Sequence, residues 1–157
     1  MTGVDIARAA EFIAVWAFLG LSIAVSIALR LFILNLMLCA IGWSLFTLGM
    51  YIHHLSHAAH PKAHEDLDAI DYIADHGIYA WVRHPGYLGL MLMFFGIAIA
   101  FGSILAVGVA VILSIYHYIL ACKEERQMLK KFGEAYIKYM ERVPDRFLPI
   151  RKVLRRR

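Results

Sequence analysis

The sequence predicts an all-α integral membrane protein with about four transmembrane helices in two hairpins and a C-terminal amphipathic helix. Apolar residues make up 61% of the 157 residues and charged residues only 18%, whereas a soluble domain is nearer half apolar and a quarter charged. The charge is also unevenly placed, because twelve of the sixteen Lys and Arg residues follow Cys122. The surplus apolar surface is therefore expected to face lipid, with one hydrophilic end in water.

Two apolar runs form the predicted N-terminal hairpin, which occupies residues 1–52. They extend from Ala9 to Leu29 and from Leu31 to Ile52, and each reaches the roughly 20 residues that cross a bilayer. Only Arg30 separates them, which predicts a tight turn. Neither run alternates apolar and polar residues, and backbone groups in hydrocarbon must be bonded within the chain, so both runs are predicted to be helices.

A second hairpin is predicted over residues 86–121. Its first run follows Pro85 and ends near Phe101, and its second extends from Ile104 to Ala121. Gly102-Ser103 between them suits a tight turn. The first of these runs is slightly short for a span, so the hairpin is expected to thin the bilayer locally or to stop short of the far headgroups.

Two polar segments complete the single predicted domain, a loop over residues 53–85 and a C-terminal segment over 122–157. The stretch from Lys123 to Val143 has the period of an amphipathic helix and precedes a proline; its apolar positions are Leu129, Phe132, Tyr136, Met140 and Val143. The C-terminal segment holds twelve basic and five acidic residues, and positive charge favours the cytoplasmic side. Four spans then place the N-terminus and the polar loop on that side too.

The polar loop is rich in histidine, with His53, His54, His57, His60 and His64 in its first part. Several recur at helical spacing and could bind zinc or haem iron from one face, which makes a non-enzymatic helical bundle one hypothesis. Pro61 interrupts that face, and we favour a solvated or structural loop, so no metal ligand is assigned. The two cysteines indicate neither a disulfide framework nor a metal site.

Two further clusters contain residues suited to chemistry. One extends from His76 to Gly89 and combines a guanidinium, imidazoles and aromatic rings, and the other is Lys123-Glu124-Glu125-Arg126. The second hairpin would bring Arg83 and the two glutamates to the same membrane face. Ionisable groups at a span edge are costly unless they are paired or solvated. There are plainer interpretations of both clusters. The guanidinium of the first cluster could simply reach the lipid headgroups, and its aromatic rings could form a belt at the membrane surface. The two glutamates could lie at a solvated helix end.

The order and spacing of these residues resemble those of the isoprenylcysteine carboxyl methyltransferase family, and related phospholipid methyltransferases share part of the pattern. The pattern is Tyr79-x3-Arg83-His84-Pro85-x-Tyr87-x-Gly89, then Glu124-Glu125-x3-Leu129-x2-Phe132-Gly133-x2-Tyr136-x2-Tyr139-x3-Val143-Pro144. The resemblance covers Tyr79 to Pro149, nearly half of the chain. Asp145 departs from the pattern as an additional residue in its closing segment, residues 143–149.

The resemblance implies S-adenosylmethionine as methyl donor, with S-adenosylhomocysteine as product, and a C-terminal segment that covers the cofactor. Arg83 and Glu125 are the expected catalytic residues, with Arg83 able to bind a carboxylate in two-point contact and Glu125 an ammonium or ribose hydroxyls. Tyrosine rings could stack on adenine or face the sulfonium. The expected cofactor-binding residues are His76, Gly77, Tyr79, His84, Pro85, Tyr87, Leu88, Glu124, Glu125 and Tyr136.

The resemblance also implies a lipophilic acceptor that enters from the bilayer, first of all the carboxylate of a prenylated cysteine. A phospholipid amine or a small thiol is the nearest alternative. A soluble Rossmann methyltransferase is excluded, because the chain has no strand, glycine loop and helix in sequence. The basic end from Arg151 to Arg157 is expected to contact anionic headgroups and not nucleic acid.

Overall fold

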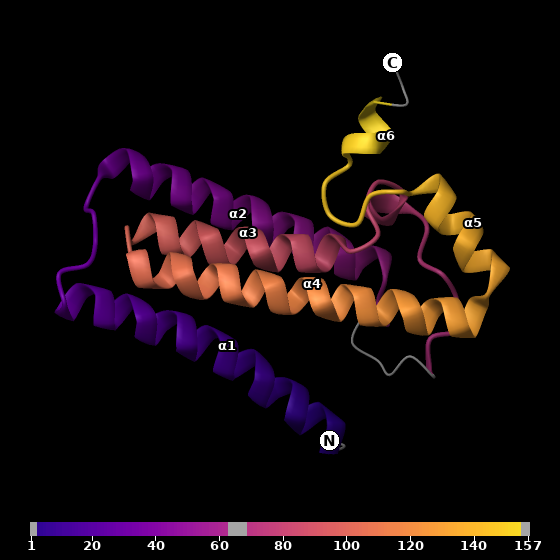
Figure 1. The fold of residues 1–157 in the computed structure, drawn as a ribbon, viewed down its shortest axis with the longest axis horizontal. Helices are drawn as coiled ribbons and strands as arrows, with labels where there is room; N and C mark the ends of the chain where they lie inside the picture. The colour runs from indigo at the N-terminus through magenta and orange to yellow at the C-terminus, as the bar shows by residue number, and fades with distance from the viewer. Residues whose placement is uncertain (1–2, 63–68, 155–157) are drawn as a thin grey trace. The chain divides into compact units, whose positions relative to one another are not determined.

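The computed structural model describes residues 3–62 and 69–154 and shows a helical chain (Figure 1). Its elements are α1 (Gly3–Ala28), α2 (Leu36–Ala59), the 3-10 helix η2 (Gly77–Ala80), α3 (Pro85–Ala100), α4 (Ile104–Phe132), α5 (Glu134–Arg142) and α6 (Ile150–Leu154). Within the described residues the only β-type pairing is an isolated bridge between Phe32 and Ser103. The predicted all-α fold is confirmed.

Among the described residues, three helices are long and apolar enough to cross a membrane, namely Ala10–Ala28, Leu36–Ala59 and Ile104–Phe132. The fourth apolar helix, α3, has 16 residues and falls below spanning length. Its shortness agrees with the sequence, which predicted a run ending near Phe101. A count of four spans therefore stays a prediction.

The chain turns at Arg30 as predicted, with Arg30 at φ 57, but the connection is longer than predicted. Helix α1 ends at Ala28 and α2 begins only at Leu36, so a linker follows the turn. Asn35 explains the late start, because its side-chain carbonyl accepts from the backbone N–H groups of Met37 (2.8 Å) and Leu38 (3.2 Å). This is the N-cap arrangement that satisfies the free donors of a first helical turn. At its other end α2 continues to Ala59, past the predicted end at Ile52.

The chain forms two compact units, of which the first comprises residues 1–47 and 91–115. Helices α2 and α3 approach closely there, since a Cβ on Gly96 would lie 2.5 Å from the backbone nitrogen of Phe46. The Trp16 and Phe94 rings meet edge to face at 5.5 Å. Such small residues let backbones pack closely, which is how helices associate in lipid.

The second unit comprises residues 48–90 and 116–157 and holds the polar clusters. Its apolar core is built on Tyr136, Tyr139 and Val143. The single amphipathic helix predicted from Lys123 to Val143 is wrong, because α4 continues to Phe132 and α5 starts separately at Glu134 (Figure 1). Gly133 between them has φ 52 and ψ −125, a conformation that a side chain disfavours, and it breaks the helix.

Candidate functional site

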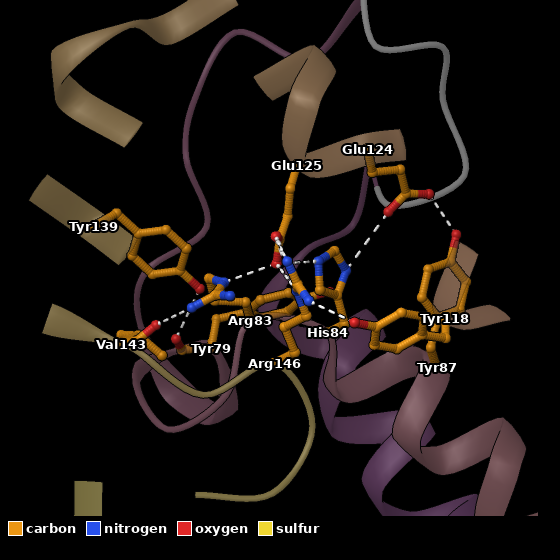
Figure 2. Close-up of polar contacts among 10 residues, drawn as sticks. All are labelled: Tyr79, Arg83, His84, Tyr87, Tyr118, Glu124, Glu125, Tyr139, Val143 and Arg146. Carbon is orange, nitrogen blue, oxygen red and sulfur yellow. Dashed lines mark hydrogen bonds and ion pairs between the residues drawn. The ribbon is translucent and has the colours of Figure 1, made fainter. Parts of the chain in front are cut away.

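The centre of the site is a buried ion pair between Arg83, which precedes α3, and Glu125 on α4 (Figure 2). Arg83 Nε donates to Glu125 Oε1 at 2.9 Å, and the two side chains are 6% and 5% exposed. Buried charges are stable only when they are paired and hydrogen-bonded. The sequence predicted that these two residues would meet, and the structure brings them together.

Glu125 has two more side-chain partners. His84 Nε2 lies 3.2 Å from Oε1, and Arg146 approaches Oε2 through Nε at 3.0 Å and a terminal nitrogen at 2.9 Å. The second terminal nitrogen of Arg146 donates to the Tyr118 hydroxyl at 3.0 Å. These hydrogen bonds to Glu125 raise the pKa of the Arg146 guanidinium. Both oxygens of Glu125 are therefore engaged by the protein itself.

Residues 143–146, here called the C-terminal strap, are tied to the segment that carries Arg83. The backbone N–H of Arg83 donates to the Asp145 carbonyl at 3.0 Å, and that of His84 to the Arg146 carbonyl at 2.9 Å. A terminal nitrogen of Arg83 also donates to the Val143 carbonyl at 2.7 Å. The strap and the Arg83 segment thus form one hydrogen-bonded structure closed by Glu125.

A second carboxylate, Glu124, lies beside this structure and is more open. Its side chain is 45% exposed. It accepts a hydrogen bond from the Tyr87 hydroxyl, and its other oxygen lies 3.6 Å from His84 Nδ1. The Tyr87 ring stacks on His84 with 5.8 Å between centroids and meets the buried His117 ring edge to face at 5.3 Å. His84 therefore stands between the two glutamates.

Three tyrosines join the remaining elements of this unit. The Tyr139 hydroxyl donates to the Tyr79 carbonyl at 3.0 Å, and the Tyr79 hydroxyl is hydrogen-bonded to Ser56 at 2.8 Å. Tyr136 packs with Tyr139 and Val143 in the apolar core. Burial raises the pKa of the Tyr79, Tyr136 and Tyr139 hydroxyls above the ordinary tyrosine value. These groups stay neutral and act as hydrogen-bonding and packing elements.

A hollow of about 530 Å³ lies beside η2, the 3-10 helix that precedes Arg83 in the chain. Its wall is mostly apolar and is built from the end of α2, η2 and the residues on either side of η2; it is lined by Leu55, Ala58, Ala59, His76, Gly77, Ile78 and Trp81. Trp81 is 40% exposed, and the Lys152 ammonium lies 5.4 Å from its ring centre. The hollow is open to the surface on one side.

The predicted site residues thus divide into groups. Arg83, His84, Tyr87, Glu124 and Glu125 form one polar network, whereas His76 and Gly77 line the hollow. Pro85 is buried at the start of α3, and the Leu88 N–H bonds to the His84 carbonyl at 3.1 Å.

Sequence reasoning missed Arg146, Tyr118, His117 and Ser56. Arg146 stood in the recognised closing segment, so its position was a usable signal. The other three are ordinary residues of apolar helices, and nothing in the sequence singled them out.

The histidine-rich loop lies partly outside the described residues, His64 included. Over the ranges that are described, no three His, Cys, Asp or Glu side chains converge in a way that could hold a metal ion. His60 Nδ1 is hydrogen-bonded to the Tyr72 hydroxyl at 2.7 Å. The cluster of ligands that a haem or zinc bundle would need is therefore not seen in this part of the chain.

Comparison with known proteins shows the family. Residues 37–135 match the model of the family described as phospholipid methyltransferase. The protein-S-isoprenylcysteine O-methyltransferases of Mus musculus and Homo sapiens are each 27% identical over 103 residues, which is 64% of this chain and 34% of theirs. The matched region thus spans about a third of the length of these relatives. Because the model matches more than half of the chain, the chain belongs to the phospholipid methyltransferase family.

Proposed function

We propose that the chain is an S-adenosylmethionine-dependent methyltransferase that acts on a lipophilic acceptor from the membrane. The observation that carries this proposal is the meeting of Arg83, His84, Glu124 and Glu125 at one place, within the region matched by the family. Two segments distant in sequence build a charged, partly open site, one directly before the apolar helix α3 and the other on α4. Such a site suits a polar methyl donor and a lipid-like acceptor.

The residues fit that donor chemically. The hollow beside η2 has the apolar and aromatic wall that an adenine ring requires, and its lining includes His76 and Trp81. Glu124 has a carboxylate open enough to meet an ammonium or ribose hydroxyls. When bound, S-adenosylmethionine supplies a methyl group already activated by positive sulfur. The protein then needs mainly to align the reactants and to exclude water.

Arg83 and Glu125, predicted as catalytic residues, are proposed to act as positioning residues. They are hydrogen-bonded to each other and to the C-terminal strap, and both side chains are nearly fully buried. They fix the loop that presents His84 and Tyr87 next to Glu124. Cofactor contact is assigned to Glu124, Tyr87, His76 and Gly77, and the orientation with the basic C-terminal segment on the cytoplasmic side is retained.

The leading acceptor is the carboxylate of an isoprenylated cysteine. A carboxylate attacks the methyl group without prior loss of a proton, so no base is required of the site. The name of the matched Mus musculus and Homo sapiens relatives describes this chemistry for those proteins. Phospholipid amines and small thiols are the competing acceptors, and an amine would need to be neutral and to release a proton.

Binding of S-adenosylhomocysteine to the purified protein in nanodiscs tests the donor. We expect saturable binding by calorimetry that Glu124→Gln weakens about tenfold or more, as the loss of one hydrogen bond to a charged group implies. Glu134→Gln, at an exposed glutamate of α5, is the matched control and should bind like the wild type. Absence of binding by the wild-type protein would overturn the proposed function.

A side-by-side assay of labelled methyl transfer to a farnesylcysteine analogue, phosphatidylethanolamine and a thiol tests the acceptor. Label on the farnesylcysteine analogue that is released by mild base would identify an ester and support the leading acceptor. Base-stable label on either other compound would support methyl transfer and reject the carboxylate acceptor.

A further inference from the structure

His53 and His57 lie one turn apart near the end of α2, and one imidazole nitrogen of each lies close to the other. Their Nε2 atoms are 3.1 Å apart, and their ring centroids are 4.5 Å apart in an edge-to-face arrangement. Both side chains are half-buried, so they are ordered but remain within reach of a small ion. A spacing of four residues on a helix brings two side chains to the same face.

The hydrogen bond of His53 Nδ1 determines which nitrogen of this ring can act as a ligand. His53 Nδ1 lies 3.1 Å from the carbonyl oxygen of Gly86, in the first turn of α3. A carbonyl only accepts, so Nδ1 carries the proton and the Nε2 lone pair points towards His57. A histidine that binds a metal nearly always donates its other N–H to a carbonyl or carboxylate in this way.

We propose that His53 and His57 chelate a divalent transition-metal ion through their Nε2 atoms. Histidine–metal bonds are about 2.0–2.1 Å long, so two nitrogens 3.1 Å apart subtend about 95–100° at a shared ion. That angle lies between the roughly 90° of square or octahedral coordination and the roughly 109° of a tetrahedron. The separation of the two nitrogens thus suits a shared ion, and each ring turns on binding so that its lone pair points at the ion and not at the other nitrogen.

Two imidazoles define the class of ion. Nitrogen ligands of this kind suit Cu²⁺, Ni²⁺ and Zn²⁺, and they disfavour Mg²⁺ and Ca²⁺, which take oxygen. Where the structure describes the chain, no set of three His, Cys, Asp or Glu ligands is found, so the proposal is confined to these two imidazoles. Without metal, one proton on His57 Nε2 bridges the two nitrogens. The ion takes the place of this proton, and His57 shifts to the tautomer protonated on Nδ1, so that it binds as a neutral imidazole.

Because of where the two histidines lie, an ion bound by them would connect two helices. Through Gly86 the metal-binding pair is linked to the first turn of α3, close in sequence to His84 of the polar network. An ion would hold the final turns of α2 against this part of α3. This site is separate from the proposed cofactor contacts and does not depend on the methyltransferase proposal.

Copper binding to the full-length chain, purified with a histidine-free tag and stripped with chelator, tests the assignment. We expect one tightly bound Cu²⁺ per chain, with an electron paramagnetic resonance spectrum that shows coupling to two imidazole nitrogens. His53→Ala and His57→Gln should each weaken binding at least about tenfold. The glutamine variant is informative because its amide can keep the hydrogen bond to His53 but is a poor ligand.

Two control variants separate this pair from the other histidines of the cluster. His54→Ala removes an exposed neighbour, and His60→Ala removes the partner of Tyr72. Both should retain wild-type copper affinity, with circular dichroism spectra unchanged in all four variants. Wild-type binding by His57→Gln, loss of binding in His54→Ala or His60→Ala, or coupling to fewer than two nitrogens would each overturn the proposal.

Discussion

Arg83 and Glu125 are 42 positions apart in the chain, yet they form the most enclosed charge pair of the site, with 2.9 Å between Nε and Oε1. Each also contacts the C-terminal strap, Arg83 through the Val143 carbonyl and Glu125 through the Arg146 guanidinium. The pair therefore joins three segments of the chain. We therefore expect that loss of this ion pair disturbs the fold of the second unit, and that any effect on catalysis follows from that.

Glu125→Ala is expected to destabilise the protein by about 3–5 kcal/mol, the usual cost of leaving a buried charge without its partner. The reason is that Arg83, also buried, would lose its counter-ion. Chemical denaturation in mixed micelles, followed by circular dichroism, measures the change. Glu134→Ala, at an exposed position of α5, is the control and should change stability by no more than about 0.5 kcal/mol. Equal stability of the two variants would refute the structural role of Glu125.

Arg146→Lys should weaken S-adenosylhomocysteine binding about tenfold although the positive charge is retained. Lysine cannot reproduce the two-point contact to Glu125 together with the bond to Tyr118. A charge-assisted hydrogen bond contributes roughly 1.5–3 kcal/mol, and 1.4 kcal/mol corresponds to tenfold in affinity. Arg142→Lys alters a pair with Asp75 on the exposed surface and should leave affinity unchanged. The role of the strap would be disproved if both variants bound like the wild type.

The fold was largely predictable because hydrophobic run length is a strong signal. All four apolar helices appear where the composition indicated, and the break at Gly102-Ser103 falls between α3 and α4. The errors concern helix ends. Asn35 caps α2 through its side chain, and Gly133 ends α4 through its backbone conformation. A hydrophobic period carries no information on either event.

The candidate site was predictable only in part. The convergence of Arg83 and the glutamates followed from hairpin geometry, since both lie at the same end of paired helices. The sequence did not show that Glu125 would contact two arginines and a histidine, because Arg146 reaches it from a segment beyond α5. Long-range contacts of this kind depend on the path of the C-terminal segment, which local pattern does not define.

Gly133→Ala tests the backbone break between α4 and α5. A Cβ at Gly133 would meet no atom within 4 Å, so any cost comes from its φ of 52 alone. We expect destabilisation of about 1–2 kcal/mol. Gly108→Ala is the matched control, since that position also has open space but lies inside α4 without a positive φ, and it should be neutral or stabilising by up to about 1 kcal/mol. Similar effects at both positions would contradict the conformational explanation.

The stability of the second unit is expected to fall at alkaline pH because its tyrosines are buried. Burial raises the pKa of the Tyr139 hydroxyl, and of Tyr79 and Tyr136, above the ordinary value of about 10. Below about pH 10 both folded and unfolded chains keep these protons, so the stabilisation is complete. As the pH rises further, the unfolded chain releases protons that the folded protein retains, and stability declines until the folded groups ionise too.

Denaturation midpoints measured at intervals between about pH 8 and pH 11 check this expectation. Tyr139→Phe should be less stable than the wild type by about 1–3 kcal/mol near pH 8, because the Tyr79 carbonyl loses its hydrogen-bond donor. The difference between the two proteins should shrink towards pH 11, since the variant has one buried hydroxyl fewer to lose. Lysines titrate in both proteins alike, so this difference isolates Tyr139. A gap that is constant or grows with pH would show that burial of this hydroxyl does not govern the alkaline decline.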